Sequence, residues 1–258
     1  MTTADVALIT ERRYERPAHV DDYVGNILRE DAILTEALAA QGLTAARVDW
    51  SRPDVDWGAF RCLLLRTPWD YFDRLDEFSA WLDGLEGRVP VLNELGTVRW
   101  NLDKHYLAEL SRRGVPIPPT LFLERGRPVD LAERLAHAGW PQAVLKPAVS
   151  GAARHTYRVD RDRAALHQPL LDELVAREAM MLQPFLPDVV ARGEVTVVVI
   201  DGTCTHAVLK VAKPGDFRVQ DDHGGTVHPH APSPDELELA RAAMATISPP
   251  PRSARADI

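Results

Sequence analysis

The chain has 258 residues, of which 45% are hydrophobic and 26% charged, a balance typical of an ordered protein with one large or two modest domains. Acidic side chains outnumber Lys and Arg by 38 to 30, giving a formal charge of −8. This excess argues against a general nucleic-acid or anionic-membrane binder, because such proteins need surplus positive charge. Two cysteines exclude a disulfide framework or a Cys-rich zinc site. With no membrane-length apolar run and no signal-like N-terminus, we expect a soluble cytoplasmic protein.

The first hundred residues alternate strand-like and helix-like patterns. The predicted strands are residues 6–10, 47–50, 60–65 and 89–93, and the predicted helices run through Ile27–Leu38 and Leu75–Leu85. This order predicts a small, mostly parallel sheet covered by helices. Ligands of such sheets bind beyond the carboxyl ends of the strands, where the segment Arg66–Tyr71 (RTPWDY) follows the third strand.

The pattern changes near residue 100, where we place a domain boundary. Asn101 or Asp103 is expected to cap a helix that ends before Gly114, with Lys104 in its first turn. The turn Asp201-Gly202 tolerates positive φ angles and predicts a hairpin between two apolar strands. This half is predicted to be antiparallel and mixed, with further strands at residues 120–123, 143–146, near 157 and 180–183, and helices at 130–138, 162–178 and 234–247.

Several common signatures are absent: the Walker phosphate loop, GxGxxG, HExxH and GxSxG. A cationic strand end is present instead. Lys146 closes the run AVLK and precedes the small-residue turn Ser150–Arg154. An ammonium beside backbone N–H groups that small residues leave open suits polyphosphate, although a solvated strand end is the alternative interpretation.

The order of the motifs over nearly the whole chain resembles the ATP-grasp superfamily, in its glutathione-synthetase-like branch. The motifs are Asn101–Lys104, Val144–Pro147, Ser150-Gly151, Gln183–Leu186, Gly193-Glu194 with the hairpin after it, Lys210, Gly215–Gln220 and Gly224-Gly225. Within the branch, RTPWDY together with GDFRVQ is most similar to the D-cycloserine-forming ligase group, whose enzyme closes a ring from O-ureido-D-serine with ATP and Mg²⁺.

The resemblance implies an α/β (α+β) architecture. A Rossmann-like substrate-side domain (1–100) would precede a two-subdomain ATP-grasp domain (101–258), divided at 183/184 and truncated before its last strand. The implied activity is that of an ATP-dependent ligase or cyclo-ligase. It would activate the carboxylate of a small amino-acid-like substrate as an acyl phosphate for attack by a nitrogen nucleophile, as in antibiotic biosynthesis. A homo-oligomer is possible, and no nucleic-acid or membrane partner is expected.

The resemblance also assigns the ATP site. Lys104 and Lys146 would hold the α- and β-phosphates, with Ser150 and Gly151 in the turn that covers them. The adenine would be read by the backbone of the hinge formed by Gln183, Pro184, Phe185 and Leu186. Either Asp188 or Glu194 would accept the ribose hydroxyls, and either could equally be an exposed loop acid.

The reaction needs a positively charged side chain beside the transferred phosphoryl group, to stabilise its negative charge. Arg218 or Lys210 would supply it, unless Arg218 is a surface hairpin residue. On the substrate side, Arg66 would bind a carboxylate and Asp70 an ammonium or ureido N–H. The pocket would be completed by Thr67, Trp69, Tyr71, Gly224 and Gly225, although Trp69 and Tyr71 could instead pack the domain interface.

For metals, the spacing of His223, His228 and His230 favours a polar loop over a zinc site. Asp257 is interpreted as the first Mg²⁺ ligand, in a segment where the family begins its metal-binding strand, and no carboxylate follows it. Alternatively, the segment from residue 247 onward is a disordered tail. Both interpretations predict impaired catalysis. Two further hypotheses are a non-catalytic remnant that binds nucleotide or a partner, and a kinase-like phosphotransferase.

Overall fold

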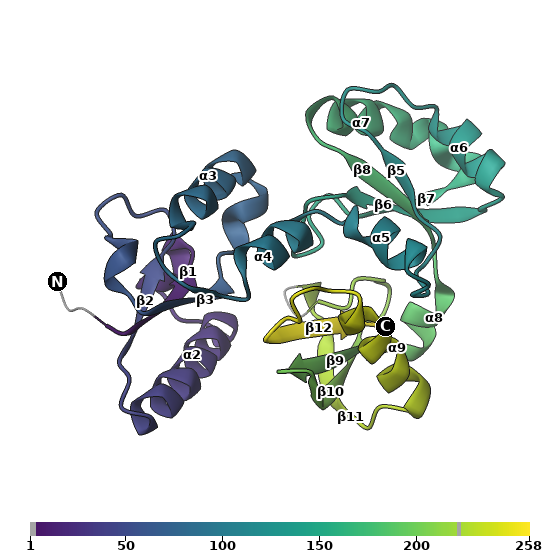
Figure 1. The fold of residues 1–258 in the computed structure, drawn as a ribbon. Helices are drawn as coiled ribbons and strands as arrows, with labels where there is room; N and C mark the ends of the chain where they lie inside the picture. Colours follow the sequence, from purple (N-terminus) through teal and green to yellow (C-terminus); the bar gives the residue numbers. More distant parts are fainter. Residues whose placement is uncertain (1–3, 221–222) are drawn as a thin grey trace. The chain divides into compact units, whose positions relative to one another are not determined.

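The computed structural model describes residues 4–220 and 223–258, which form two compact units (Figure 1). The first, here called unit 1, contains the chain up to Arg99 together with Pro251–Ser253. The second, unit 2, contains Trp100–Pro250 and Ala254–Ile258. Both mix helices with strands, and the predicted α/β fold class is confirmed. In the described residues no helix is long and apolar enough to cross a membrane.

As predicted, unit 1 is built on a small parallel sheet. Its four strands have the order β2-β1-β3-β4. The strands are β1 (Val6–Thr10), β2 (Ala45–Asp49), β3 (Cys62–Thr67) and β4 (Val91–Leu92). The helical segments are α1 (Arg12–Glu15), α2 (Asp22–Ala40), η1 (Trp57–Ala59), η2 (Trp69–Phe72) and α3 (Leu75–Leu85). Helices α2 and α3 lie on opposite sides of the sheet (Figure 1).

Local sequence explains these elements. All five residues of β1 are buried, which is why the run VALIT has no polar alternation. Asp21 caps α2 by accepting a hydrogen bond from the Val24 backbone N–H at 2.8 Å. Helix α3 buries Phe78, Leu82 and Leu85, which recur at helical spacing.

Unit 2 contains two antiparallel systems. The first sheet has the order β5-β8-β6-β7, with β5 (Leu121–Leu123), β6 (Gln142–Pro147), β7 (Tyr157–Asp160) and β8 (Met180–Pro184). Its helical segments are α6 (Leu131–Ala138), η3 (Arg161–Arg163) and α7 (Ala164–Arg177). Leu131, Leu135 and Leu171 are fully buried in one core with the strand residues Leu145 and Leu182.

The second sheet has the order β11-β10-β9-β12, with β9 (Glu194–Ile200), β10 (Thr203–Val211), β11 (Thr226–His230) and β12 (Ser253–Asp257). Its helices are α8 (Pro187–Arg192) and α9 (Pro234–Ala245). The hairpin between β9 and β10 forms as predicted, because Asp201 and Gly202 both adopt positive φ, at 47° and 77°. A core of Val195, Val197, Val199, Ala207 and Ala240 joins this sheet to α9.

The helix boundaries around residue 101 differ from the prediction. Asn101 is not a cap, because α4 (Leu95–Leu102) runs through it and α5 begins only at Tyr106, ending at Arg112. Lys104 lies in the break and not in a first turn. Its backbone N–H donates to the Ala148 carbonyl at 2.9 Å instead of continuing a helix, and Asp103 Oδ1 accepts from the His105 N–H at 3.0 Å.

The end of the chain is ordered, so the interpretation of a disordered tail is wrong. Residues Ser253–Asp257 form β12, and just beyond it Ile258 exchanges two backbone hydrogen bonds with Val195 of β9 at 2.8 and 3.1 Å. The expected polar loop at His228 and His230 is also wrong, since both lie in β11, paired with β10. In each case a partner strand far away in sequence decides the structure.

A clamp of three hydrogen bonds returns the chain to unit 1 near its end. The Asn93 Nδ2 donates to the Ser253 carbonyl at 2.7 Å, and its Oδ1 accepts from the backbone N–H groups of Arg252 and Ser253 at 2.5 and 3.1 Å. One side chain thereby binds Pro251–Ser253 to a unit otherwise made of the first 99 residues.

Candidate functional site

Lys104 and Lys146 come together in unit 2 although 42 positions separate them. Lys104 sits in the break between α4 and α5, and its Nζ donates to the Ser150 carbonyl at 2.7 Å. Lys146 is on β6. Burial and, to a smaller extent, the positive charge of Lys146 together lower the pKa of Lys104 to about 8. Burial likewise lowers the pKa of Lys146, whereas the Glu194 carboxylate opposes the fall.

Neither lysine has a carboxylate within ion-pair distance among residues 4–220 and 223–258. Two half-buried ammonium groups that repel each other are unfavourable in the free chain. An anion bound between them would remove both penalties, so this pair suits a polyphosphate. The motif order predicted both residues as phosphate ligands, and the structure brings them together; it did not indicate the Ser150 carbonyl that binds Lys104.

The turn after β6 is held in an unusual backbone conformation. Ala152, Ala153 and His155 all have positive φ, between 47° and 51°, which is uncommon for residues with a Cβ. Internal hydrogen bonds support it: the Arg154 N–H donates to the Gly151 carbonyl at 3.0 Å, and the Ser150 hydroxyl donates to the Arg154 carbonyl at 3.2 Å. The carbonyl of Ser150 faces Lys104, which puts the predicted covering turn beside the lysine pair.

The predicted hinge follows β8. Gln183 is buried, and its Nε2 donates to the Thr120 hydroxyl at 2.9 Å. The Phe185 backbone N–H donates to the Gln142 carbonyl at 3.0 Å, while its ring contacts the Arg158 guanidinium and, edge to face, the ring of Phe217. Pro184 ends β8, and Leu186 is 42% exposed immediately before α8. Phe185 therefore connects the hinge to the Gly215–Gln220 segment.

The two ribose candidates differ in surroundings. Asp188 on α8 is largely exposed, with only a 3.8 Å contact to Arg192. Glu194 begins β9 opposite Lys210 on β10, and its Oε1 lies 3.0 Å from the Lys210 Nζ. Gly193 makes this register possible, because a Cβ there would lie 2.6 Å from the Lys210 carbonyl.

Lys210 is held between two acids. Besides Glu194, its Nζ lies 3.0 Å from Asp257 Oδ1, which also accepts a 2.5 Å hydrogen bond from the Thr196 hydroxyl. Burial alone would raise the pKa of Asp257, but the charges of Arg255 and Lys210 and the Thr196 hydrogen bond hold it below its usual range. The positive charge of Lys210 is thus balanced by two carboxylates, unlike the charges of Lys104 and Lys146.

The positive charge of Arg218 is also balanced by a carboxylate, that of Asp216. Its Nε and Nη2 bind the two oxygens of Asp216 at 3.0 and 2.7 Å. This hydrogen bonding, stronger than the opposing effect of burial, keeps the pKa of Asp216 well below its usual range. The backbone of Gly225 packs against Val219, since a Cβ at Gly225 would lie 2.2 Å from the Val219 carbonyl oxygen. The neighbouring Gly224 has a positive φ of 82°.

Metal binding depends on how the carboxylates and histidines of the chain are grouped. In the part of the chain that the structure describes, no three His, Cys, Asp or Glu side chains are grouped to hold an ion. Asp257, the predicted Mg²⁺ ligand, is already engaged by Thr196 and Lys210. Magnesium is usually held by one or two carboxylates together with substrate phosphates, so Asp257 would have to exchange its contact with Lys210 to serve as a ligand. His230 is paired with Glu236 at 3.0 Å, and His228 with the Thr226 hydroxyl at 2.9 Å.

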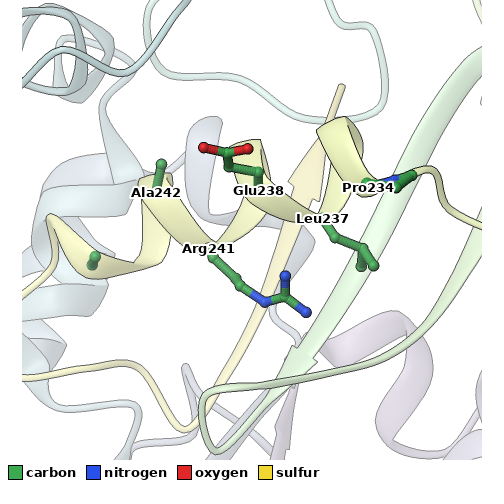
Figure 2. Close-up of a pocket in the computed structure, with 6 residues that line it drawn as sticks. Pro234, Leu237, Glu238, Arg241 and Ala242 are labelled. Atoms are coloured by element: carbon green, nitrogen blue, oxygen red, sulfur yellow. The ribbon is translucent and has the colours of Figure 1, made fainter.

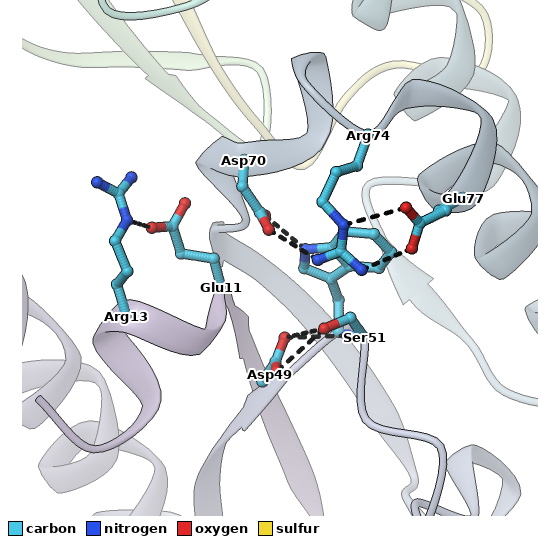
Figure 3. Close-up of polar contacts among 8 residues, drawn as sticks. Glu11, Arg13, Asp49, Ser51, Asp70, Arg74 and Glu77 are labelled. Atoms are coloured by element: carbon cyan, nitrogen blue, oxygen red, sulfur yellow. Dashed lines mark hydrogen bonds and ion pairs between the residues drawn. The ribbon is translucent and has the colours of Figure 1, made fainter.

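The substrate-side prediction concerns unit 1. Arg66 contacts Glu30 at 2.5 Å and Asp31 at 3.5 Å, both on α2, so its charge is already matched. Asp70 accepts from the Trp50 indole at 2.7 Å and from Arg74 at 3.0 Å (Figure 3). Both residues are therefore tied into the unit in a way that sequence alone did not indicate.

The neighbouring predicted residues pack within the same edge. The Thr67 hydroxyl contacts the Thr10 hydroxyl at 2.6 Å. Trp69 packs against the rings of Tyr14 and Tyr23, with centroids 5.9 and 6.1 Å away. Tyr71 packs on Phe72 and Phe78. These aromatic contacts support the alternative that Trp69 and Tyr71 are structural.

Sequence reasoning missed Glu11, directly after β1 (Figure 3). It is 1% exposed and forms an ion pair with Arg13. The signal was available, because an acid that immediately follows a fully apolar parallel strand lies at the edge where such sheets bind ligands.

A groove of about 630 Å³ runs along α9 (Figure 2). None of the predicted site residues lines it; the lining residues are Pro234, Leu237, Glu238, Arg241, Ala242 and Ala245.

Comparison with known proteins matches both units. Residues 117–249 match the family described as prokaryotic glutathione synthetase, ATP-grasp domain, and residues 6–93 match D-cycloserine synthetase DcsG, N-terminal domain. The cycloserine biosynthesis protein DcsG of Streptomyces lavendulae is 33% identical over 199 residues, which are 76% of this chain. The match spans 64% of that relative's length.

Solved structures agree. The crystal structure of D-cycloserine synthetase DcsG matches with a TM-score of 0.80 and 27% identity, over 98% of this chain and 85% of that one. D-alanine–D-alanine ligase from Bacillus anthracis shares the fold, with a TM-score of 0.65 and 16% identity over 98% of this chain and 81% of that one. The sequence resemblance is thereby confirmed. The chain belongs to the ATP-grasp family and is related to D-cycloserine synthetase.

Proposed function

We propose that the chain is an ATP-dependent carbon–nitrogen ligase or cyclo-ligase for a small amino-acid-like substrate, with unit 2 as its ATP-grasp domain and unit 1 on the substrate side. The observation that carries the proposal is the pair Lys104 and Lys146, which lacks carboxylate partners within the described residues. The matches to a cycloserine biosynthesis protein support an amino-acid-like substrate and a role in antibiotic biosynthesis.

The proposed reaction has two steps. A substrate carboxylate oxygen attacks the γ-phosphorus of ATP, and the bond to the bridging oxygen breaks to release ADP. A nitrogen of the substrate then attacks the acyl carbon, loses a proton, and expels phosphate. Lys104 and Lys146 offset the α- and β-phosphate charge, an effect that is strongest where water is excluded.

Lys210 and Arg218 are proposed to stabilise the transferred phosphoryl group. In the structure both are bound to acids, so each must exchange a carboxylate for a phosphate oxygen. Arg218 is the better donor, because its planar guanidinium can bind two oxygens at once. Magnesium would enter with ATP, whose phosphate oxygens would supply most of its ligands.

A second candidate function rests on the ion pairs that Lys210 and Arg218 form with acidic side chains. With Lys210 and Arg218 both neutralised, the chain could bind nucleotide without turning it over. Isothermal titration with ATP, with and without Mg²⁺, combined with phosphate release, distinguishes the two. The ligase requires phosphate release and an acyl phosphate that hydroxylamine traps as a hydroxamate. Binding that is indifferent to Mg²⁺ and produces no phosphate supports the second function, while phosphate release without hydroxamate supports a phosphotransferase.

A further inference from the structure

The segment between α4 and α5 holds Lys104 at two points. Its backbone N–H donates to the Ala148 carbonyl at 2.9 Å, and its Nζ donates to the Ser150 carbonyl at 2.7 Å. The residues on either side of it, Asp103 and His105, take no part in the proposed reaction. Their contacts with each other decide which charge lies beside Lys104.

Asp103 is bound by His105, the residue on the other side of Lys104. Its Oδ1 accepts hydrogen bonds from the His105 backbone N–H at 3.0 Å and from the His105 Nδ1 at 2.6 Å. Because an ionised carboxylate only accepts hydrogen bonds, the ring nitrogen Nδ1 is the donor. Two hydrogen bonds to one oxygen fix the direction of this carboxylate.

The His105 ring is itself held by β5 and the residue after it. The ring stacks on that of Phe122 in β5, with centroids 4.1 Å apart and planes at 21°. Its Nε2 lies 3.4 Å from Oε1 of Glu124, which follows β5 directly. The ring therefore has a support outside the helix break, and this support fixes the position of Asp103.

The charge of Asp103 acts on Lys104 although the two side chains are not paired. Burial and the positive charge of Lys146 lower the pKa of Lys104 to about 8, and the negative charge of Asp103 opposes this fall. Among the described residues, Asp103 forms its ion-pair contact with His105 and none with Lys104. A carboxylate paired with this ammonium would compete with phosphate, since either anion can bind the same charge.

We infer that His105 is a positioning residue that holds the Asp103 carboxylate away from Lys104, and so keeps the Lys104 ammonium open to phosphate. The phosphate rests on the proposed function, whereas the arrangement of the three side chains is a property of the free chain. Asp103 is 47% exposed, so it can turn to Lys104 at little cost once His105 is removed.

The first test is an NMR titration of the lysine side chains in the full chain without nucleotide. The chain has four lysines, at positions 104, 146, 210 and 213, and Lys104→Arg identifies the signal of Lys104. His105→Ala should raise the titration midpoint of Lys104 by about half a pH unit or more, because Asp103 then pairs with it. Asp103→Asn should lower that midpoint, because a supporting negative charge is lost. A loss of packing alone would not move the midpoint in opposite directions.

The second test is titration calorimetry with ATP at pH 7. His105→Ala should weaken ATP binding about three- to tenfold, because phosphate must then displace Asp103. His105→Asn, whose amide Nδ2 can donate in place of the imidazole Nδ1, should bind ATP like the unaltered chain. The double variant with Asp103→Asn and His105→Ala should also recover, since the competing carboxylate is gone. His137→Ala, an exposed histidine on α6 of the same unit, is the matched control and should change nothing.

Thermal unfolding checks that each variant is folded. An unmoved Lys104 midpoint in His105→Ala, or an ATP affinity that the double variant does not restore, would overturn the inference. Either result together with normal ATP binding by the unaltered chain leaves the proposed function standing. Shifted midpoints in a chain that binds no ATP would overturn the proposed function and still support the positioning role of His105.

Discussion

Unit 1 and unit 2 carry opposite imbalances of buried charge. In unit 2, two ammonium groups lie near each other without a carboxylate partner among the described residues, whereas Lys210 and Arg218 in the same unit are fully paired. In unit 1, the buried charged group at the sheet edge is an anion, Glu11, which pairs with Arg13. Unmatched buried charge destabilises a free chain, and sites that bind oppositely charged ligands are where such charge persists. The lysine pair supports the proposed recognition of phosphate in unit 2.

The largest expected effect tests the cationic side of this comparison. Lys146→Ala should weaken ATP binding about 10- to 100-fold, because a charge-assisted contact is worth about 1.5–3 kcal/mol. Lys213→Ala is the matched control, since Lys213 is exposed in the same unit, and it should bind ATP like the unaltered chain. Titration calorimetry measures both. An equal loss of ATP affinity in the two variants would mean that ATP binding depends on the overall positive charge of unit 2 and not on Lys104 and Lys146.

A second change separates packing from charge. Gly225→Ala puts a Cβ 2.2 Å from the Val219 carbonyl and should lower the free energy of unfolding by about 1–3 kcal/mol. ATP affinity should stay within about threefold, since neither lysine is touched. Gly96→Ala is the control, because no atom lies within 4 Å of its added Cβ in α4. Chemical denaturation is the measurement; an unaltered unfolding free energy for Gly225→Ala would contradict the loop geometry.

The pH dependence tests the repulsion between the lysines. Lys104 has a pKa of about 8 in the free chain, below its usual 10.5, and a bound polyanion would raise it. Below pH 8 the group is already protonated, so affinity is flat. Above pH 8 binding must take up a proton, so ATP affinity should fall by up to about tenfold per pH unit. Titrations from pH 7 to 9.5 measure this, and a profile that stays flat to pH 9.5 would show that Lys104 does not contact the phosphates.

The smallest effect concerns stability in unit 1. A carboxyl group whose folded pKa is raised favours the folded chain when protonated, and that contribution is lost as pH rises from the unfolded value of 4.5 through the folded one. Glu11→Gln should therefore increase stability at pH 7, by less than about 1 kcal/mol because the Arg13 ion pair is lost too. At pH 4 the gain should vanish. Thermal unfolding at both pH values measures it, and destabilisation at pH 7 would indicate that Arg13 fully compensates the charge.

Local signals in the sequence predicted much of the fold. The apolar run of β1 and the residues of the Asp201-Gly202 turn favour their structures locally, without a distant partner. The parallel sheet and the hairpin were therefore predictable. The strand β12 was not, because the short polar run SARAD becomes a strand only through its pairing with β9.

The same distinction applies to the candidate site. Lys104 and Lys146 stand out from motif order alone. The partners that neutralise Arg66 come from α2, 35 positions earlier in the case of Asp31, and a sequence does not display such pairing. Glu11 was missed because its burial depends on its three-dimensional surroundings.

The Asn93 clamp has a consequence for how the molecule can be divided. Unit 1 is not a contiguous stretch of sequence, since its edge includes Pro251–Ser253, held by three hydrogen bonds to one side chain. A fragment ending near residue 99 would lose that segment and leave both polar ends of Asn93 without partners. The two units therefore do not behave as interchangeable modules. Recombination that exchanges the first hundred residues must also supply a side chain at position 93 that can recapture the returning chain.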